Sequence, residues 1–580
     1  MQRGQLIVNL SKEEQDSYYA LGYWKDETIV DYFKKSVKKN PNKEFLVDTR
    51  GKRFTYAQVD ERVKRLALKF HDMGLDRGEM IAHQMTNCAE AYIMMLAAYS
   101  VEAILSPIVP VYKGKGVVEM LNVTKPRAII VHDAFGGYEY AKKIGESKKE
   151  IPSIEHIFVE GKNVPEGMIS LNEIIENPVD TKRADSILSD YHPRGWNIEK
   201  VAFTAGTTGT PKGSIQRFDN QMYNIRKYIE GLKITEDDIT LGMTPITHQW
   251  CWLYAFGMPI MTNSKVVLMD SWNAENCSRL IDKEKVTYFC GMTTFLLDFT
   301  DHWIKNKDKY NFSSLRVGHV AGQKLVPRRM IKAAREIGFK NLYGVWGQTE
   351  NCAPVTHAVD PKATDSDDLL CDKTGLMWPE MQYDLKDPET GKSVPQGSIG
   401  EMCMKGPSIC QGYYGNVEAT AKTWDKDGWF HATDLFSVDP DGWLIFQGRL
   451  IEMLRRGAEN VYLAGIERSL DVFVGNHPKI KEATIVAVQD ERLGERGCLC
   501  LVVREKQFLN ELNHVQLLEG FNTHLLQQGF NKFQLPEYVH LYEDYPRSAM
   551  QRIKKLDMSK ELSELKRKKQ LKGVAEDALR

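Results

Sequence analysis

The sequence predicts an α/β protein with a large N-terminal domain, rich in parallel sheet, and a small α+β C-terminal domain. Amphipathic helical patterns alternate with short apolar runs through most of the chain, which is typical of parallel strands joined by helices. After about residue 450 the pattern changes to strands that follow one another directly. The 580 residues, 42% of them hydrophobic, are enough for more than one core.

The expected helices and strands follow in the order that a parallel sheet requires. Residues 56–73 predict an amphipathic helix, because apolar side chains recur along them at helical spacing. Residues 91–112 predict a buried helix and then a strand, since a glutamate and two prolines argue against a membrane span. Apolar runs at 128–131 and 157–159 predict buried strands, and the polar stretch 179–199 predicts a surface connection.

The C-terminal part predicts a separate compact unit. Two strands, a helix and a strand are expected at 482–489, 498–505, 515–528 and 538–543. We therefore expect an N-terminal domain over residues 1–449 and a C-terminal domain over 450–580. The charge-rich last twenty residues predict a solvated helix.

Composition and charge narrow the class of protein. The 77 basic and 78 acidic side chains nearly cancel, which argues against a general nucleic-acid binder, since such proteins carry a basic excess. The N-terminus has no apolar stretch of signal-peptide length. The ten cysteines form no CxxC pair and no metal-type spacing with histidine. We expect free thiols, a cytoplasmic location and no stable membrane insertion.

The segment VAFTAGTTGTPKGSIQ (201–216) gathers glycines, threonines and one lysine between two extended pieces. Glycine lets backbone N–H groups converge on an anion, because no Cβ blocks the approach. Threonine hydroxyls add donors and the lysine adds a positive charge. The segment therefore predicts a loop for the β- and γ-phosphates of ATP. Its candidate binding residues are Thr204, Gly206, Thr207, Thr208, Gly209 and Lys212.

This loop differs from the usual P-loop. Pro211 stands where GxxxxGK[ST] requires glycine, and the following SIQRF looks extended rather than helical. A flexible glycine–threonine turn is the alternative interpretation of the loop taken alone. Other motifs decide between the two.

TAGTTGTPKG (204–213) resembles the signature of the adenylate-forming superfamily, which includes acyl-CoA synthetases, aryl-acid activating enzymes, peptide-synthetase adenylation domains and firefly-type luciferases. GVWGQTE (344–350) resembles the family's YGxTE motif. The resemblance implies adenine packing at Trp346 and Gly347, a Thr349 hydroxyl on the α-phosphate and Mg²⁺ on Glu350. An indole face can stack on a purine, and a hard cation prefers carboxylate and phosphate oxygens.

Three further segments extend the resemblance over nearly the whole chain. VAGQKL (320–325) resembles the other wall of the adenine slot, and HATDLF with DGWLIFQGRL, within 431–450, resembles the ribose site. RRGAENVYLAGIE (455–467) resembles the loop that lines the pantetheine tunnel of CoA-using members, directly after the hinge. The implied residues are Gly322, Gln323 and Lys324 for adenine, Asp434 and Arg449 for ribose, Gly457, Ala458 and Glu459 for CoA, and Ile451 for the hinge.

PITHQW (245–250) resembles the motif beside the acyl pocket, which implies that His248 lies close to the substrate carboxylate. A structural histidine is the alternative. The opening GYWKDETIVDYF (22–33) resembles the start of aryl-acid and cyclohexanecarboxylate activators. We expect a compact pocket for a ring-containing or short-to-medium acid, although aromatic residues also serve as ordinary core. Its expected wall is Gln249, Trp250, Trp252 and Phe295.

The resemblance implies that the C-terminal domain is a mobile lid, and this lid departs from the family pattern. Members carry a lysine in a PRTxxGK motif, whereas PRSAMQRIKK (546–555) has Arg552 at the lysine position. Arginine keeps the positive charge, but the two side chains are not interchangeable. We expect Arg552 to bridge the acyl carboxylate and the α-phosphate, with adenylation slower or tuned for the reverse direction. Lys554 or Lys555 is the alternative if the loop shifts.

The resemblance thus implies a carboxylate–CoA ligase that uses ATP, Mg²⁺ and CoA and forms an acyl-adenylate, AMP and pyrophosphate. The reverse direction, which makes ATP, is an alternative. The implied catalytic residues are Lys212, His248, Thr349 and Arg552. Small-molecule partners follow: a carboxylic acid, ATP and CoA. The alternatives are an aryl-acid AMP ligase that loads a carrier protein, and a nucleotide-binding homologue without turnover.

Overall fold

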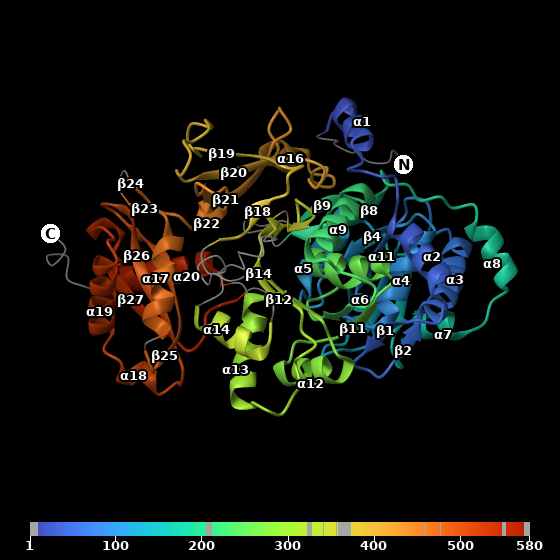
Figure 1. Ribbon diagram of the computed structural model, residues 1–580, viewed down its shortest axis with the longest axis horizontal. Coiled ribbons are helices and arrows are strands. Elements are labelled where there is room, and N and C mark those ends of the chain that lie inside the picture. Colours follow the sequence, from blue (N-terminus) through green and yellow to red (C-terminus); the bar gives the residue numbers. More distant parts are fainter. Residues whose placement is uncertain are drawn as a thin grey trace.

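The computed structural model describes residues 10–204, 211–321, 328–339, 341–354, 356–357, 373–456, 459–475, 477–547 and 553–573. It contains two seven-stranded sheets, a four-stranded antiparallel sheet and a six-stranded C-terminal sheet. In Figure 1 the C-terminal elements lie at one end of the long axis and the N-terminal helices α2 and α3 at the other. No helix among the described residues is long and apolar enough to cross a membrane.

The first seven-stranded sheet ends in the hairpin that carries the phosphate loop. Its strands are parallel except for the final antiparallel pair. In spatial order they are β7 (Ile169–Ser170), β6 (His156–Glu160), β5 (Ala128–His132), β3 (Met80–Gln84), β4 (Ile104–Pro107), β8 (Ile198–Thr204) and β9 (Lys212–Arg217).

The second seven-stranded sheet is also parallel except for the pair at one edge. In spatial order it contains β14 (Asn341–Gly344), β13 (Val317–Ala321), β12 (Tyr288–Met292), β10 (Ile239–Gly242), β11 (Lys265–Leu268), β1 (Glu44–Asp48) and β2 (Arg53–Thr55). Two short ladders follow it, β15 (Gly347–Gln348) with β16 (Ala353–Pro354), and β17 (Thr356–His357) with β18 (Leu376–Met377).

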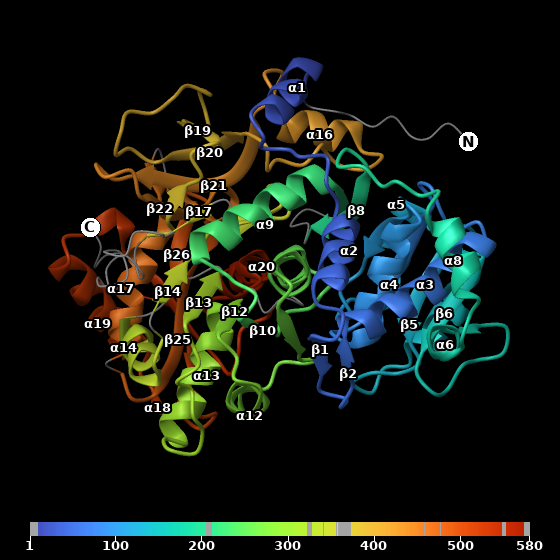
Figure 2. The same cartoon turned by 45° about the vertical axis from the view of Figure 1, so that its right-hand side comes forward.

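Helices cover both faces of these sheets and create three apolar cores. The largest core contains side chains from both sheets together with α4 and α9, whereas two smaller cores lie against the outer faces. Helix α4 is buried from its first residue to Tyr99, as an all-round apolar sequence requires. Figure 2 shows α9 as a long helix in front of the strands.

The helices of this large part are α1 (Lys12–Ala20), α2 (Ile29–Lys39), α3 (Tyr56–Asp72), α4 (Ala89–Ser100), α5 (Lys115–Thr124), α6 (Tyr140–Ser147), α7 (Leu171–Glu176), α8 (Thr181–Leu188), α9 (Phe218–Leu232), α10 (Gln249–Cys251), α11 (Met258–Thr262), α12 (Ala274–Glu284), α13 (Thr293–Lys305) and α14 (Arg328–Ile337). Together with the two sheets they confirm the predicted large α/β domain.

The four-stranded sheet runs β19 (Gln382–Lys386), β20 (Gly400–Lys405), β21 (Phe430–Val438) and β22 (Leu444–Arg449), with α16 (Val417–Thr423) beside it. The C-terminal sheet begins after the short helix η4 (Leu450–Glu452). It contains β23 (Leu454–Arg456), β24 (Glu459–Val461), β25 (Ile480–Asp490), β26 (Gly494–Val503), β27 (Tyr538–Tyr542) and β28 (Lys572–Gly573).

Side chains of the C-terminal sheet alternate between two small cores, as a period of two requires. One core contains α17 (Leu463–Gly475) and α19 (His514–Gln527), and the other contains α20 (Lys555–Arg567). The short helix α18 (Phe508–Glu511) precedes α19. This confirms the smaller α+β domain. The predicted boundary between residues 449 and 450 lies where β22 ends and stays a prediction.

Two expectations about surface segments need correction. The stretch 179–199 contains helix α8, whose N-terminal N–H groups at residues 182 and 183 donate to the Asp180 carboxylate. A capping aspartate therefore outweighs the weak periodicity. The last twenty residues are not simply a solvated helix, because α20 ends at Arg567 and buries Leu562 against the sheet. The nine described cysteines are buried and free of disulfides.

Candidate active site

The predicted phosphate loop connects the two antiparallel strands β8 and β9. Thr204 and Lys212 face each other in the last pair of this ladder. The two ends of the loop therefore lie next to each other at the edge of the sheet. Gly206, Thr207, Thr208 and Gly209 lie outside the described residues.

Gln216 connects this hairpin to the YGxTE-like segment, and sequence reasoning missed it. Its side-chain amide donates to the carbonyl of Thr349 at 2.8 Å and to the Ser214 hydroxyl at 2.7 Å. Its oxygen accepts from the Cys352 thiol at 2.5 Å. Lys212, Ser214 and Gln216 share one face of β9, because alternate residues of a strand point the same way. That alternation was a signal from which Gln216 could have been found.

Trp346 and Asp434, separated by 88 residues, are hydrogen-bonded in the structure. The indole N–H donates to the Asp434 carboxylate at 2.8 Å, and the Gln348 amide donates to the same oxygen at 2.9 Å. Arg449 is paired with Asp434 across β21 and β22, with its Nε 3.5 Å from the other carboxylate oxygen. Gly347 lies beside Trp346 in β15. The structure therefore brings the predicted adenine and ribose residues together.

Glu350 lies in the turn after β15, between the loop hairpin and the four-stranded sheet. Its carboxylate is half-buried and accepts a hydrogen bond from the Tyr413 hydroxyl at 2.7 Å. Burial raises the pKa of Glu350, although the tyrosine and the positive charge of Lys212 act in the opposite direction. The Lys212 ammonium lies 5.3 Å from the centre of the Tyr413 ring. Tyr413, which the motifs did not indicate, thus joins Lys212 and Glu350.

His248 caps the short helix α10, with its Nδ1 accepting from the backbone N–H of Trp250 at 3.3 Å. Asn87 positions the preceding segment: its amide donates to three carbonyls, including that of Thr244 at 2.7 Å. Beside His248, three buried polar atoms have no hydrogen-bond partner in the described part of the chain. They are the Thr247 hydroxyl, the Gln249 carbonyl oxygen and the Trp250 indole nitrogen.

The three aromatic side chains expected to wall the acyl pocket each have their own aromatic or cationic neighbour. Trp252 is only 2% exposed and its ring is covered by the Lys200 ammonium, 3.5 Å from the ring centre. Trp250 packs edge-on against Tyr254. Phe295, on α13, stacks on a different tryptophan, with the rings 4.3 Å apart. Trp252 is thus buried, and the expected wall stays a prediction.

Arg552 of the lid lies outside the described residues, but the ends of its loop are placed. Arg547 and Ile553 face each other in an isolated antiparallel bridge. The Arg547 guanidinium is held by the Glu482 carboxylate at 2.8 Å. The two residues that flank the lid loop are therefore placed next to each other.

Lys554 and Lys555, the alternatives to Arg552, both have acidic partners. Lys554 lies 3.4 Å from Asp557 of the same helix. Lys555 lies 2.8 Å from Glu467 and 3.7 Å from Glu452, and these carboxylates raise its pKa despite burial. Lys555 is thus engaged inside the C-terminal part in this conformation.

The remaining predicted residues belong to the adenine wall and the lid. Gly322, Gln323, Lys324, Gly457 and Ala458 lie outside the described residues. The backbone of Ile451 belongs to η4, and that of Glu459 begins β24. Their proposed contacts with nucleotide, CoA and hinge stay predictions.

A family model described as AMP-binding enzyme matches residues 33–414. The medium-chain fatty-acid–CoA ligase of Escherichia coli (strain K12) is 26% identical over 561 residues, which cover 96% of this chain and 94% of that protein. The 2,3-dihydroxybenzoate-AMP ligase of Bacillus subtilis (strain 168) is 23% identical over 563 residues, covering 95% and 97%.

Solved structures share the fold over nearly the whole length. The anthranilate CoA ligase AuaEII in complex with anthranoyl-AMP superposes with a TM-score of 0.79 at 20% identity, covering 94% of this chain and 98% of that one. ATP-bound MatB from Rhodopseudomonas palustris gives 0.76 at 20% identity, covering 92% and 99%. The family match and the named relatives support the predicted enzyme class, an AMP-forming acid–thiol ligase. This chain therefore belongs to the family of AMP-binding enzymes, within the adenylate-forming superfamily that its motifs predicted.

Proposed function

We propose that the chain converts a carboxylic acid, ATP and CoA into an acyl-CoA, AMP and pyrophosphate, through an acyl-adenylate. One observation carries the proposal: Trp346 and Asp434 are hydrogen-bonded to each other, and Gln216 connects that segment to the loop hairpin. An aromatic ring, a ribose acceptor and a lysine-bearing loop in one place suit a nucleoside triphosphate.

The nucleoside half of ATP would be held by Trp346 and Asp434. Asp434 accepts from Trp346 and Gln348 through one oxygen, and its other oxygen lies beside Arg449. This carboxylate is the proposed acceptor for the ribose hydroxyls. A carboxylate can accept from two hydroxyl groups at once. The adenine would pack against the Trp346 and Gly347 segment, with Gly322, Gln323 and Lys324 on its other side.

Glu350 is the proposed Mg²⁺ ligand, and its surroundings fit a cation. Its half-buried carboxylate lies near the Lys212 hairpin, and a hard cation prefers carboxylate oxygens. Bound Mg²⁺ would neutralise phosphate charge and so help the carboxylate anion approach the α-phosphorus. The chain's own part is to hold Glu350 in place through the Tyr413 hydroxyl.

Adenylation brings two anions together, so charge neutralisation and alignment are the main requirements. Lys212 would bind the outer phosphates, together with the residues of its loop. Thr349 would donate its hydroxyl to the α-phosphate, and Arg552 would bridge the α-phosphate and the acyl carboxylate. His248 would lie beside that carboxylate, where three buried polar atoms lack a described partner.

The second half-reaction is proposed to use CoA. The lid would rotate about the hinge at Ile451 and remove Arg552 from the site. Gly457, Ala458 and Glu459 would then line the path of the thiol. Thiolate attack on the acyl carbon would release AMP and form the thioester.

The proposed acid is of short-to-medium length or contains a ring. Relatives are named for medium-chain fatty acids and for aryl acids, and Gln249, Trp250 and Phe295 remain the candidate wall residues. The test is a pyrophosphate-release screen over fatty, alicyclic and aromatic acids with and without CoA, with thioester products identified by mass spectrometry. The Glu350→Gln variant is the inactive control. If no acid of the panel causes pyrophosphate release, the chain would instead be a nucleotide-binding protein without turnover.

A second candidate, an aryl-acid AMP ligase that loads a carrier protein, is favoured by one relative of that name. AMP release that depends on a phosphopantetheinylated carrier, and not on free CoA, would establish it. ATP synthesis from acyl-CoA, AMP and pyrophosphate tests the reverse direction.

A further inference from the structure

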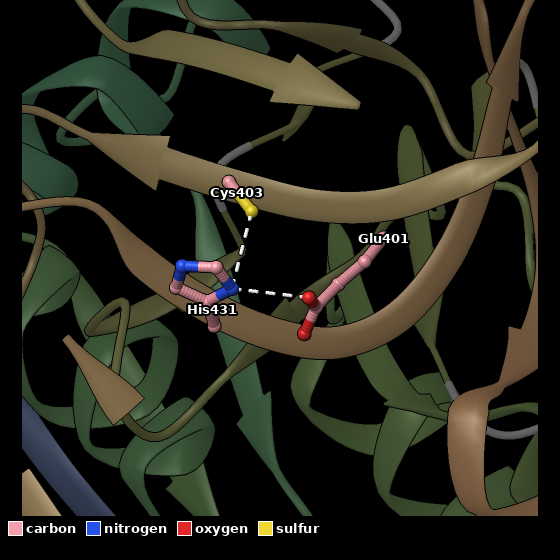
Figure 3. A group of neighbouring side chains, drawn as sticks. All are labelled: Glu401, Cys403 and His431. Carbon is pink, nitrogen blue, oxygen red and sulfur yellow. Dashed lines mark hydrogen bonds and ion pairs between the residues drawn. The ribbon is translucent and has the colours of Figure 1, made fainter. Parts of the chain in front are cut away.

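Three potential metal ligands meet in the four-stranded sheet. Glu401 and Cys403 lie two residues apart on β20 and so point to the same face. His431, on β21, is the residue directly opposite Cys403. One ligand atom from each lies within 4.8 Å of the other two. Figure 3 shows the thiol and the carboxylate both directed at the same imidazole nitrogen.

One of the two distances already matches a tetrahedral site, and the other is shorter by a few tenths of an ångström. The Cys403 sulfur lies 3.4 Å from His431 Nδ1, and the Glu401 oxygen lies 3.0 Å from the same nitrogen. Zinc bound at about 2.3 Å to sulfur and about 2.0–2.1 Å to nitrogen and oxygen separates its ligand atoms by about 3.3–3.6 Å. Side-chain rotations that move the ligand atoms by a few tenths of an ångström would therefore admit the ion.

The surroundings hold two of the three ligands in place. Asp425 Oδ2 lies 3.6 Å from the other imidazole nitrogen, His431 Nε2. The second oxygen of Glu401 accepts from the backbone N–H of Thr433 at 3.1 Å. A carboxylate behind the histidine is a common outer partner of protein metal ligands, because it fixes the ring orientation and tautomer.

The site is accessible, since the His431 side chain is 26% exposed, whereas Glu401 is 10% exposed. Thiol, imidazole and carboxylate together suit a borderline ion such as Zn²⁺ or Co²⁺ rather than Mg²⁺. We propose that Glu401, Cys403 and His431 bind one such divalent ion, with Asp425 orienting the histidine and a water at the fourth position. This proposal is independent of the proposed reaction.

An ion there would link β20 to β21 three residues before Asp434. Between them, Thr433 adopts a left-handed conformation with φ of 57°, which a β-branched residue adopts only with strain. A bound ion would help to hold that strand against β20. The ion would thus support the ribose-binding carboxylate from outside the nucleotide site.

Titration of the metal-free full chain with Co²⁺ tests the site, because thiolate-bound cobalt absorbs strongly in the near ultraviolet. We expect this absorption to saturate at one ion per chain and Zn²⁺ to displace it. Cys403→Ser should abolish the absorption, and Glu401→Gln and His431→Gln should each weaken Co²⁺ binding at least tenfold. Asp425→Asn should weaken it about 10–100-fold.

Cys277→Ser is the matched control, since Cys277 is buried in a different core; it should leave the cobalt absorption unchanged. Circular dichroism and thermal unfolding of each variant establish that it is folded. The proposal is overturned if the unaltered chain shows no sulfur–cobalt absorption, or if folded Cys403→Ser retains it.

Discussion

Asp434 illustrates how individual side chains in this protein acquire their orientation from distant partners. One of its oxygens accepts from both Trp346 and Gln348, so the carboxylate has one preferred rotation. Arg449 lies beside its other oxygen. The expected ribose contact therefore depends on a tryptophan whose motif lies far away in the sequence.

Trp346→Phe keeps an aromatic face but removes the indole donor. We expect kcat/KM for ATP to fall about tenfold, because a hydrogen bond to a charged acceptor contributes about 1.5–3 kcal/mol. Initial rates of pyrophosphate release at varied ATP measure it. The control is Trp303→Phe on α13, because the Trp303 ring packs against the Lys307 ammonium. An equal loss of kcat/KM in this variant would contradict the assignment.

Single residues were also the hardest to predict. Lys212, Glu350 and Asp434 stand in recognisable motifs, whereas Gln216 and Tyr413 act through hydrogen bonds to segments more than 60 residues away. Such contacts depend on how sheets pack. The alternation of β9 places Gln216 on the same face as Lys212, but it does not indicate the distant partners.

At the scale of elements, β8 is joined to α4 by a buried polar cluster. Glu199 and Lys200 form an ion pair with almost no exposure, and the Tyr99 hydroxyl donates to the Glu199 carboxylate at 2.6 Å. Burial lowers the pKa of Lys200 to about 8 and raises that of Glu199. A buried charge requires such partners, so this cluster is expected to fix β8 relative to the helix.

Tyr99→Phe should lower the free energy of unfolding by about 1–3 kcal/mol, because Glu199 loses a donor while remaining buried. Tyr228→Phe is a close control. Tyr228 is equally buried, but its hydroxyl has no hydrogen-bond partner in the described ranges. Urea unfolding of both variants measures the difference, and equal losses would contradict the explanation.

The two seven-stranded sheets are joined by another charged cluster. Glu160, at the end of β6, contacts Arg50, which follows β1, at 2.9 Å and His132 at 2.6 Å. Burial alone would raise the pKa of Glu160, but these two partners lower it to about 2. The ionised glutamate therefore stabilises the fold above its unfolded pKa, and this stabilisation is lost as the pH falls toward about 2.

Glu160→Gln should remove this dependence on pH. Between pH 6 and pH 3 the unaltered chain should lose about 1–2 kcal/mol of unfolding free energy relative to the variant. Glu155→Gln, which affects an exposed pair with Arg127, should show little such difference. Parallel curves for Glu160→Gln and the unaltered chain would refute the assignment.

At the scale of the whole molecule, the small C-terminal sheet is attached through η4, between β22 and β23. Catalysis by the proposed two-step route would require this connection to change conformation. Arg552 would serve the first step, and the segment after the hinge would serve the second.

Ile451→Pro should separate the two half-reactions, because proline fixes φ near −65° and restricts the proposed rotation. We expect adenylation, followed as acid-dependent pyrophosphate release, to change differently from thioester formation from preformed adenylate. Val417→Pro is the control, since proline is tolerated at the first position of a helix such as α16. Equal changes in the rates of both steps would show that Ile451 is not the hinge residue.

The fold was largely predictable because helix and strand periods differ clearly in the parallel part of the chain. The predictions failed where a local feature was short. Asp180 caps α8 within a polar stretch, and Met558 and Leu562 turn a charged helix toward the core. The wall of the acyl pocket stays a prediction. Trp250 and Trp252 stand two residues apart around a helical turn and so point in different directions.

The pairing of Thr204 with Lys212 has a mechanical consequence. The two ends of the loop are held by one cross-strand pair of the ladder. Binding of an anion therefore costs little additional loop-closure entropy. Any rearrangement on nucleotide arrival must then be confined to the residues between those two anchors, and cannot spread into the sheet without breaking backbone hydrogen bonds of the ladder.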